Sequence, residues 1–245
     1  LVKPFNSLML LTRARSLMQI KRLHDELESR NRLLFEVLNK YMAEEVVDQV
    51  LTDPERYLRL GGDTRRVTVL FADIRGFTRF SEVHPPEVVV DVLNHVFRVL
   101  TQIVFRNHGT FDKFLGDAIM AFYGAPLSGP DDAQRALQTA LAMQATFGEL
   151  CAGDERMAGL GLGIGLSTGD ATVGNFGSDR VMDYTVIGDT VNVASRLQVL
   201  AKAGEVLISA ATYQDVSGVA AECLHEQSIY GRREPVTIYR ITLPQ

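Results

Sequence analysis

Two aspartates stand where apolar stretches of this sequence end, and the pair could hold a cation. Asp73 closes the apolar run 66–73 (RVTVLFAD), and Asp117 lies with Gly116 between two further apolar runs. Two carboxylates that approach each other repel and raise one pKa unless a positive charge lies nearby. With no His or Cys in either motif, the oxygen ligands favour Mg²⁺ or Mn²⁺. Two such ions between paired aspartates support in-line displacement at phosphorus.

The segment after Asp73 could bind phosphate through its main chain. A turn at Gly76 followed by the start of a helix would present successive backbone N–H groups to phosphate oxygens. Each aspartate also has a simpler reading as a turn or capping residue, because Asp is common at strand ends and N-caps. Asp73 and Asp117 could therefore be either metal ligands or turn and capping residues.

The elements that would position these residues follow a mixed pattern of strands and helices. The hairpin turn at Gly116-Asp117 breaks the strict alternation that a doubly wound nucleotide fold requires. The order β-α-β-β-α-β instead predicts an α+β fold with a ferredoxin-like sheet and helices packed on one of its faces, in which Asp73 and Asp117 reach one edge. The expected elements are strands at 66–73, 109–115, 118–124, 161–177 (strand and turn), 182–188, 205–209 and 236–242, and helices at 86–106, 130–150 and 189–203.

The N-terminal segment has a helical pattern, unlike the mixed strands and helices of the rest of the chain. No Gly or Pro occurs between about Leu8 and Leu51, so one long helix is expected. Its apolar positions follow a heptad interrupted by Arg30, which predicts a short parallel coiled coil; the alternative is an amphipathic helix packed on its own domain. We therefore expect an N-terminal helical segment at 1–52 and a main domain at 53–245. The heptad positions are Ile20, Leu23, Leu27, Leu34, Val37 and Tyr41.

Composition narrows the possible partners. A chain of 245 residues with 46% hydrophobic content can bury a large core, and a net charge of −5 argues against nucleic acid or an anionic membrane as the main partner. The two cysteines lack metal or disulfide spacing, so we expect a reducing cytoplasm. No apolar run approaches the roughly 20 residues of a membrane span, so no membrane segment is expected. Because the chain starts at Leu1, it reads as a piece of a longer protein.

Three motifs together resemble the catalytic domain of the class III nucleotidyl cyclases. They are VTVLFADIRGFTRFSE, GTFDKFLGDAIMAFYGAP and DYTVIGDTVNVASRLQ, and the similarity runs from about residue 64 to about residue 241. The resemblance implies a homodimer with composite sites at the subunit interface. It also implies that Asp73 and Asp117 hold two Mg²⁺ ions, for which Mn²⁺ can substitute, with the Ile74 carbonyl as a further ligand.

The resemblance assigns the base-reading positions to Lys113 and Thr185. Lys113 only donates, so it meets the N1 acceptor of adenine and not the N1–H of guanine. Thr185 can accept from the adenine amino group, as in a subclass of adenylyl cyclases, but it can also donate. Guanylyl cyclases typically carry Glu and Cys at these positions. The expected substrate is therefore ATP, with a guanylyl or unselective cyclase as the alternative.

The remaining site residues also come from the resemblance. Asn192 is expected to orient the ribose and Arg196 to stabilise the charged transition state, one turn apart on one helix. Arg232 or Arg233 would contact the terminal phosphates. The reaction is attack of the ATP 3′-hydroxyl on the α-phosphorus; Asp73, water or a substrate phosphate could each take the proton. Triphosphate contacts are expected from Ile74, Arg75, Gly76, Phe77 and Thr78.

Two segments that precede the first motif also bear on the function. The start of the chain, LVKPFNSLMLLTRARSLMQIKRL, resembles the end of a response-regulator receiver domain, which implies regulation through the N-terminal helix. The triplet GGD at 61–63 could suggest a diguanylate cyclase, but it precedes the first strand and is interpreted as a turn. A catalytically silent nucleotide-sensing module is disfavoured, because all six positions of the family set are filled.

Overall fold

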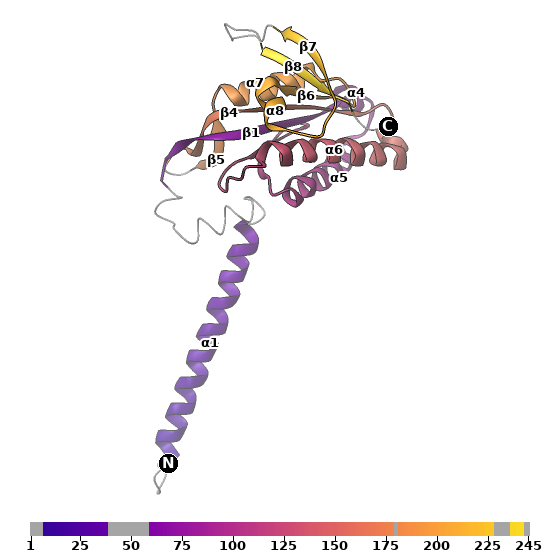
Figure 1. Cartoon of the computed structure of the whole chain (residues 1–245). Coiled ribbons are helices and arrows are strands. Elements are labelled where there is room, and N and C mark those ends of the chain that lie inside the picture. The colour runs from indigo at the N-terminus through magenta and orange to yellow at the C-terminus, as the bar shows by residue number, and fades with distance from the viewer. Residues whose placement is uncertain (1–6, 39–58, 179–180, 228–235, 243–245) are drawn as a thin grey trace. The chain divides into compact units, whose positions relative to one another are not determined.

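The structure is a computed structural model that describes residues 7–38, 59–178, 181–227 and 236–242. The chain divides into two compact units, Leu1–Asp48 and Gln49–Gln245. Figure 1 labels the helices and strands of both units.

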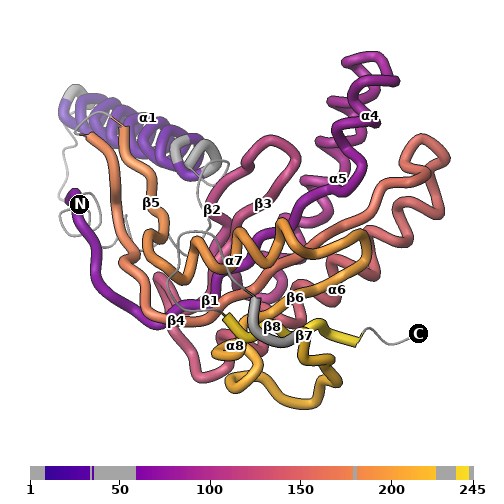
Figure 2. Tube along the Cα trace, turned by 90° about the horizontal axis from the view of Figure 1, so that it is seen from above, coloured from indigo at the N-terminus to yellow at the C-terminus, as the bar shows by residue number. Residues whose placement is uncertain are grey.

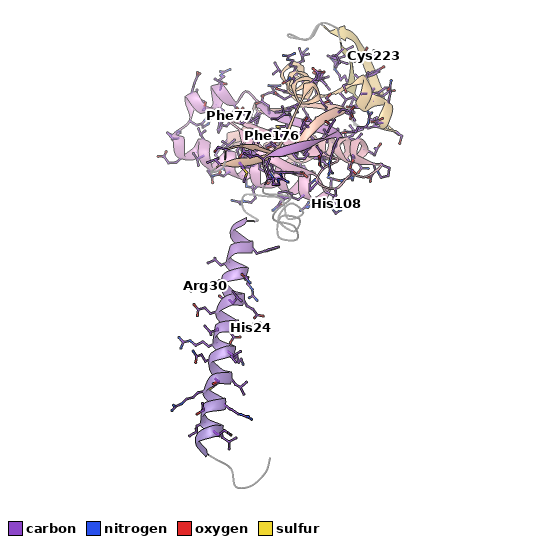
Figure 3. All side chains as sticks on the ribbon, turned by 90° about the vertical axis from the view of Figure 1, so that its left-hand side faces the viewer. His24, Arg30, Phe77, His108, Phe176 and Cys223 are labelled. Carbon is purple, nitrogen blue, oxygen red and sulfur yellow. The ribbon has the colours of Figure 1, made fainter. Side chains whose placement is uncertain are left out.

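The first unit contains the helix α1, Ser7–Leu38. The predicted helix is confirmed over this range, and residues 39–51 lie outside the described part of the chain. Arg30 forms an ion pair with Glu26 at 2.7 Å on the helix surface, and Figure 3 shows Arg30 and His24 projecting from it. Three apolar heptad positions with described side chains, Ile20, Leu23 and Leu27, are each more than half exposed in the single chain. The coiled-coil pairing itself stays a prediction.

The second unit is built on one sheet with strand order β2-β3-β1-β4-β6-β8-β7, with β5 paired to β4. Its first four strands stand in the order β2-β3-β1-β4, which the ferredoxin-like prediction requires. The strands are β1 Gly61–Arg75, β2 Thr110–Leu115, β3 Ala118–Tyr123, β4 Gly161–Gly177, β5 Met182–Ile187, β6 Val206–Ser209, β7 Ala221–Gln227 and β8 Val236–Ile241. The helices are α4 Phe77–Val83, α5 Pro86–Arg106, α6 Asp132–Gly153, α7 Asp189–Leu200 and α8 Ala210–Asp215, with a 3₁₀ turn η1 at Glu155–Met157.

Both faces of the sheet carry helices. Successive strand residues point to opposite faces, and on β1 the residues Leu70 and Ala72 join the core formed with α5 and α6, whereas Val69 and Phe71 join a second core that includes Ala194 of α7. Figures 1 and 2 show α7 across the face opposite α5 and α6. The expectation of helices on one face therefore holds for α5 and α6 and is wrong for α7.

Glycines in β4 allow α7 to lie directly on the strand. A Cβ atom at Gly165 would stand 2.2 Å from the backbone nitrogen of Gln198 and 2.4 Å from the carbonyl oxygen of Ala194, both in α7. No side chain fits at that distance, so glycine is required for the close approach. The alternation of Gly with Leu and Ile in GLGIGL places small residues under α7 and large ones in the opposite core.

The interpretation of residues 61–63 as a turn is wrong. Gly61, Gly62 and Asp63 belong to β1 and pair with Asn175, Gly174 and Val173 of β4. A Cβ atom at Gly174 would stand 2.1 Å from the Gly61 carbonyl oxygen. These glycines therefore allow β1 and β4 to approach each other closely. A pair of glycines in the sequence is equally typical of a turn, so the sequence alone does not distinguish the two.

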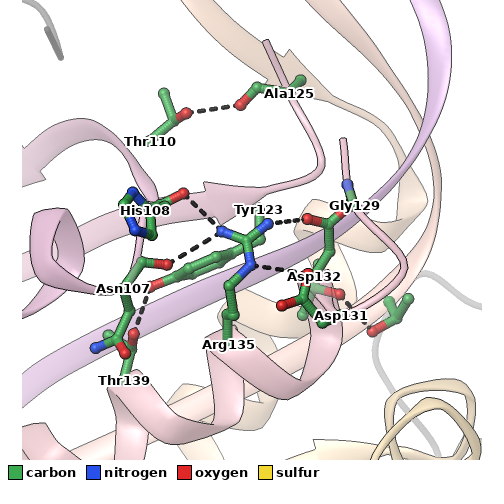
Figure 4. Close-up of polar contacts among 12 residues, drawn as sticks. Asn107, His108, Thr110, Tyr123, Ala125, Gly129, Asp131, Asp132, Arg135 and Thr139 are labelled. Atoms are coloured by element: carbon green, nitrogen blue, oxygen red, sulfur yellow. Dashed lines mark hydrogen bonds and ion pairs between the residues drawn. The ribbon is translucent and has the colours of Figure 1, made fainter. Parts of the chain in front are cut away.

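A polar network fixes the start of α6 beside the start of β2 (Figure 4). The Arg135 guanidinium donates to the carbonyl oxygens of Asn107 at 3.1 Å and His108 at 2.9 Å, and it also pairs with Asp132. The Tyr123 hydroxyl donates to Thr139 at 2.6 Å. The β2–β3 hairpin is thereby joined to α6 at its base.

One helix in the described residues, α5, is long and apolar enough to cross a membrane by length and composition. Its residues Val92, Val96 and Leu100 are buried in the core against the sheet. Core helices of this kind meet the same criterion, so it is weak evidence for a membrane span.

Candidate active site

Asp73 and Asp117 form a carboxylate pair at one end of β1. Asp73 pairs in register with Ala118, the residue after Asp117, and its side chain is 19% exposed. Burial raises the pKa of Asp117, and the charge of the neighbouring Asp73 raises it further. The structure thus brings together the two aspartates that the sequence pairs, and their negative charges repel.

The donor set of this pair fits a hard divalent cation. Two carboxylates are available, and no group of three or more His, Cys, Asp or Glu side chains occurs within the described ranges. Mg²⁺ is commonly held by one or two carboxylates together with substrate phosphates and water. The Ile74 side chain has no ligand atom and is buried in the core, so only its carbonyl oxygen could contribute.

Arg75 connects the carboxylate pair to α7. Its guanidinium forms an ion pair with Asp73, and it donates to the carbonyl oxygen of Ala201 at 2.9 Å and to that of Gln198. Because the last carbonyls of a helix lack partners within it, a cation there stabilises the helix end. The side chain of Arg75 is therefore engaged in structural contacts with Asp73 and the end of α7. The sequence did not predict these contacts, and the predicted contact of Arg75 with the triphosphate stays a prediction.

The segment after Arg75 turns as the sequence predicts. Gly76 has φ +85°, a left-handed conformation that favours glycine, and α4 begins at Phe77. Phe77 packs against the core and Thr78 is exposed; Phe77 is labelled in Figure 3. A triphosphate-binding role for Gly76, Phe77 and Thr78 stays a prediction.

Lys113 and Thr185 meet through a polar cluster, hereafter the Asp112 cluster, formed by Asp112, Lys113, Asp183 and Thr185. The Lys113 ammonium donates to Asp183 at 2.9 Å and lies 3.6 Å from Oδ1 of Asp112. The Thr185 hydroxyl donates to Oδ2 of Asp112 at 2.5 Å. One carboxylate therefore contacts both predicted base-reading residues.

A β-bulge explains how neighbouring residues 112 and 113 both reach this cluster. In β2, Phe111 pairs with Ala121 and Lys113 pairs with Met120, so Asp112 is the extra residue. A bulge bends a strand and redirects its side chains. The side chain of Asp112 is 1% exposed, whereas that of Lys113 is 33% exposed. Solvent or a ligand can therefore reach the cluster at Lys113 but not at Asp112.

Lys113 attracts both carboxylates of the cluster, Asp112 and Asp183, which repel each other. Burial alone would lower the pKa of Lys113, but the hydrogen bond to Asp183 and the charge of Asp112 outweigh burial and raise it. Burial raises the pKa of Asp112, and the hydrogen bond from Thr185 and the charge of Lys113 oppose that rise. Lys113 therefore keeps its proton and can only donate.

The remaining predicted site residues are two on α7 and two arginines near the C-terminus. Asn192 is exposed and Arg196 half-buried, both on α7, as the motif predicts. Arg232 and Arg233 lie outside the described residues. The sequence reasoning missed Asp112 and the contact of Arg75 with α7. A carboxylate directly before Lys113, inside an otherwise apolar strand, is the signal that could have found Asp112.

The fold and the carboxylate pair define a mixed α+β domain with two aspartates that could hold a divalent cation. A family model described as the adenylate and guanylate cyclase catalytic domain matches residues 62–242. The chain belongs to this family, the class III cyclases, whose domains bind nucleotide substrates and function as dimers. The sequence-based recognition is confirmed at this level.

The chain is also similar to solved structures of cyclases and to curated proteins that are described as uncharacterized. The adenylyl cyclase CyaB from P. aeruginosa is 37% identical with a TM-score of 0.72, covering 76% of this chain and 98% of that chain. The guanylyl cyclase Cya2 is 35% identical with a TM-score of 0.71, covering 75% and 95%. Rv1319c of Mycobacterium tuberculosis, described as uncharacterized, is 38% identical over 146 residues, which are 59% of this chain and 26% of that protein. The chain spans about a quarter of the length of the curated relatives it matches.

Proposed function

We propose that this chain is an adenylyl cyclase that converts ATP to 3′,5′-cyclic AMP and pyrophosphate. The observation that carries the choice of ATP is the Asp112 cluster, in which a Lys113 donor and the Thr185 hydroxyl share one buried carboxylate. A donor opposite N1 and an acceptor opposite the exocyclic amino group match adenine. The cyclase class itself follows from the family.

The proposed reaction forms a bond between the 3′-oxygen and the α-phosphorus as the bond to pyrophosphate breaks. Asn192 orients the ribose, and the Arg196 guanidinium offsets the charge that develops at phosphorus. Asp73 and Asp117 hold Mg²⁺, which when bound supplies positive charge to the hydroxyl and the phosphates. The Asp73 side chain is mostly shielded from solvent, and its ion pair with Arg75 restrains the orientation of the carboxylate.

The site works, in this proposal, at the interface of a homodimer, with the N-terminal helix transmitting a signal. Support comes from the family and from the exposed apolar positions Ile20, Leu23 and Leu27 of α1. An upstream receiver domain and a cytoplasmic location complete the proposal; the latter rests on the free cysteines Cys151 and Cys223.

A guanylyl or unselective cyclase is the second candidate. The observation that favours it is the 35% identity to Cya2, which is described as a guanylyl cyclase. A threonine hydroxyl can also donate to guanine O6 if its proton is free to turn.

A product assay separates the candidates. The chain is incubated with ATP or GTP at equal concentration, each with Mg²⁺ or Mn²⁺, and the cyclic products are separated and quantified. We expect cyclic AMP in at least tenfold excess. Predominant cyclic GMP would support the second candidate, and no product from either nucleotide would support a silent nucleotide-sensing module.

A further inference from the structure

The direction of the Thr185 hydroxyl bond is fixed by its partner. A free threonine hydroxyl donates one hydrogen bond and accepts through two lone pairs, so alone it does not distinguish a donor from an acceptor. Here its proton is directed at Oδ2 of Asp112, 2.5 Å away. An ionised carboxylate oxygen can only accept, so this bond leaves Thr185 only its lone pairs for a ligand.

The surroundings of Asp112 preserve this arrangement. Its side chain is almost fully buried, and its other oxygen faces the Lys113 ammonium at 3.6 Å. Burial raises the pKa of Asp112, whereas the hydrogen bond from Thr185 and the charge of Lys113 oppose that rise and favour the ionised form. Thr185 is 8% exposed, which leaves a small part of it accessible beside the more open Lys113.

We propose that Asp112 is a specificity-determining positioning residue, which makes the Thr185 hydroxyl an obligatory acceptor and so selects adenine over guanine. This rests on the proposed function, because it assigns the base to the Asp112 cluster. The adenine amino group donates to Thr185, whereas guanine O6 would face its lone pairs. Lys113, held by the same carboxylate, adds a donor opposite the adenine N1 acceptor.

The variant Asp112→Asn tests the direction of the bond with almost no change of shape. The Lys113 ammonium attracts the amide oxygen, which turns the amide nitrogen toward Thr185. The Thr185 hydroxyl must then accept from the amide and present its proton to the ligand. Adenine loses an acceptor and guanine O6 gains a donor.

The measurement is displacement of a fluorescent ATP analogue from the full chain by unlabelled ATP and GTP, which needs no turnover. We expect the ratio of ATP affinity to GTP affinity to fall roughly tenfold in Asp112→Asn, the order expected for one reversed buried hydrogen bond. Thr185→Ser should keep the wild-type ratio and Thr185→Val should lose it. Asp183→Asn is the matched control, because it makes the same charge change beside Lys113 without touching Thr185.

A double variant decides whether Asp112 acts through Thr185. In the Thr185→Val background, Asp112→Asn should leave the affinity ratio unchanged. An equal fall in both backgrounds, or an unchanged ratio in the single variant, would overturn the proposal. If Asp112→Asn does not fold, as judged by circular dichroism, the Ser and Val variants of Thr185 still decide: equal ratios for both would refute an acceptor role. A wild-type chain that binds ATP selectively but forms no product would refute the proposed function alone.

Discussion

At the scale of single residues, the proposed reaction depends on the charge of Asp73. This aspartate combines low exposure, an ion pair with Arg75 and a neighbouring carboxylate that raises the repulsion between them. Arg75 compensates the charge of Asp73, whereas ionised Asp117 is unfavourable for stability without a further cation, because burial and the charge of Asp73 raise its pKa. Such a site is expected to bind a divalent ion tightly enough to affect folding stability.

Replacing Asp73 by alanine should abolish turnover without unfolding the domain. We expect product formation to fall at least a hundredfold, the order seen when a group acting on transition-state charge is removed. In thermal unfolding, Mg²⁺ should raise the midpoint of the wild type but not that of Asp73→Ala. The matched control is Asp63→Asn, an exposed position of the same strand. Equal Mg²⁺ effects on all three proteins would contradict the assignment.

Tyr123 gives a pH-dependent prediction that concerns stability. Its hydroxyl is buried against Thr139, and burial raises its pKa above the usual value. An ordinary tyrosine in the unfolded chain titrates at about 10. The stability from neutral Tyr123 is thus fully present below about pH 10 and is lost as the pH rises above that value, toward the folded-state pKa.

Tyr123→Phe should therefore lower the free energy of unfolding by about 1 kcal/mol at pH 7. The difference from the wild type should shrink between about pH 10 and 11, because phenylalanine does not ionise. Urea unfolding at several pH values measures this. Thr139→Val is the control, since it removes the hydrogen bond but keeps the ionisable phenol. A constant difference across this pH range would contradict the prediction.

Most of the carboxylate pair could be predicted from the sequence, whereas the Asp112 cluster could not. Asp73 and Asp117 follow apolar runs, and strand ends are readable from composition. The position of Asp112 depends on a bulge, which sequence alternation does not reveal, because one extra residue shifts the side chains that follow it. The contact of Arg75 with Ala201 joins residues 126 positions apart and needs the packing of α7.

At the scale of elements, the packing of α7 on β4 determines where its polar residues stand. The main chains approach so closely at Gly165 that the helix cannot move toward the sheet or rotate freely. Arg75 fixes the end of the same helix through the Ala201 carbonyl. Asn192 and Arg196 therefore project from a helix held by both main-chain packing and an anchored C-terminus.

Gly165→Ala should displace α7. Its Cβ would stand 2.2 Å from the Gln198 nitrogen, so the helix must shift, at a cost of roughly 1–3 kcal/mol in stability. Product formation should fall more than the folded fraction does, because Asn192 and Arg196 move with the helix. Gly148→Ala in α6 is the control: its Cβ meets nothing within 4 Å, and alanine favours a helix. Urea unfolding and the product assay distinguish the two; equal behaviour of both variants would refute the role of close packing.

The order of elements was predictable where local patterns are strong. The hairpin of β2 and β3 and the helix α5 follow from turn residues and apolar periodicity. The sequence did not predict β7 and α8, because short elements depend on pairing with distant strands. The length of β1 was underestimated for the same reason, since Gly61 and Gly62 become strand only by pairing with β4.

At the scale of the whole molecule, the proposed function depends on the association of two chains. Cyclase domains function as dimers, and α1 carries apolar residues that the single chain leaves exposed. Burial of such residues in a helix pair is a large favourable term. The coiled-coil proposal assigns Leu27 to the contact seam and Met18 to the opposite side of the same helix, position f of the heptad.

Leu27→Glu should therefore weaken the dimer, and Met18→Glu should not. Both side chains are exposed in the single chain, by 57% and 64%, so neither change disturbs a core within one subunit. A buried glutamate on the seam would be unpaired, and we expect the dimer dissociation constant to rise at least roughly tenfold, which corresponds to about 1.4 kcal/mol. Analytical ultracentrifugation measures this directly. On dilution, activity per subunit should decrease once the dimers dissociate. This decrease should begin at a higher protein concentration for Leu27→Glu than for the wild type or Met18→Glu. Equal dissociation constants for the two variants would show that the Leu27 seam does not join the subunits.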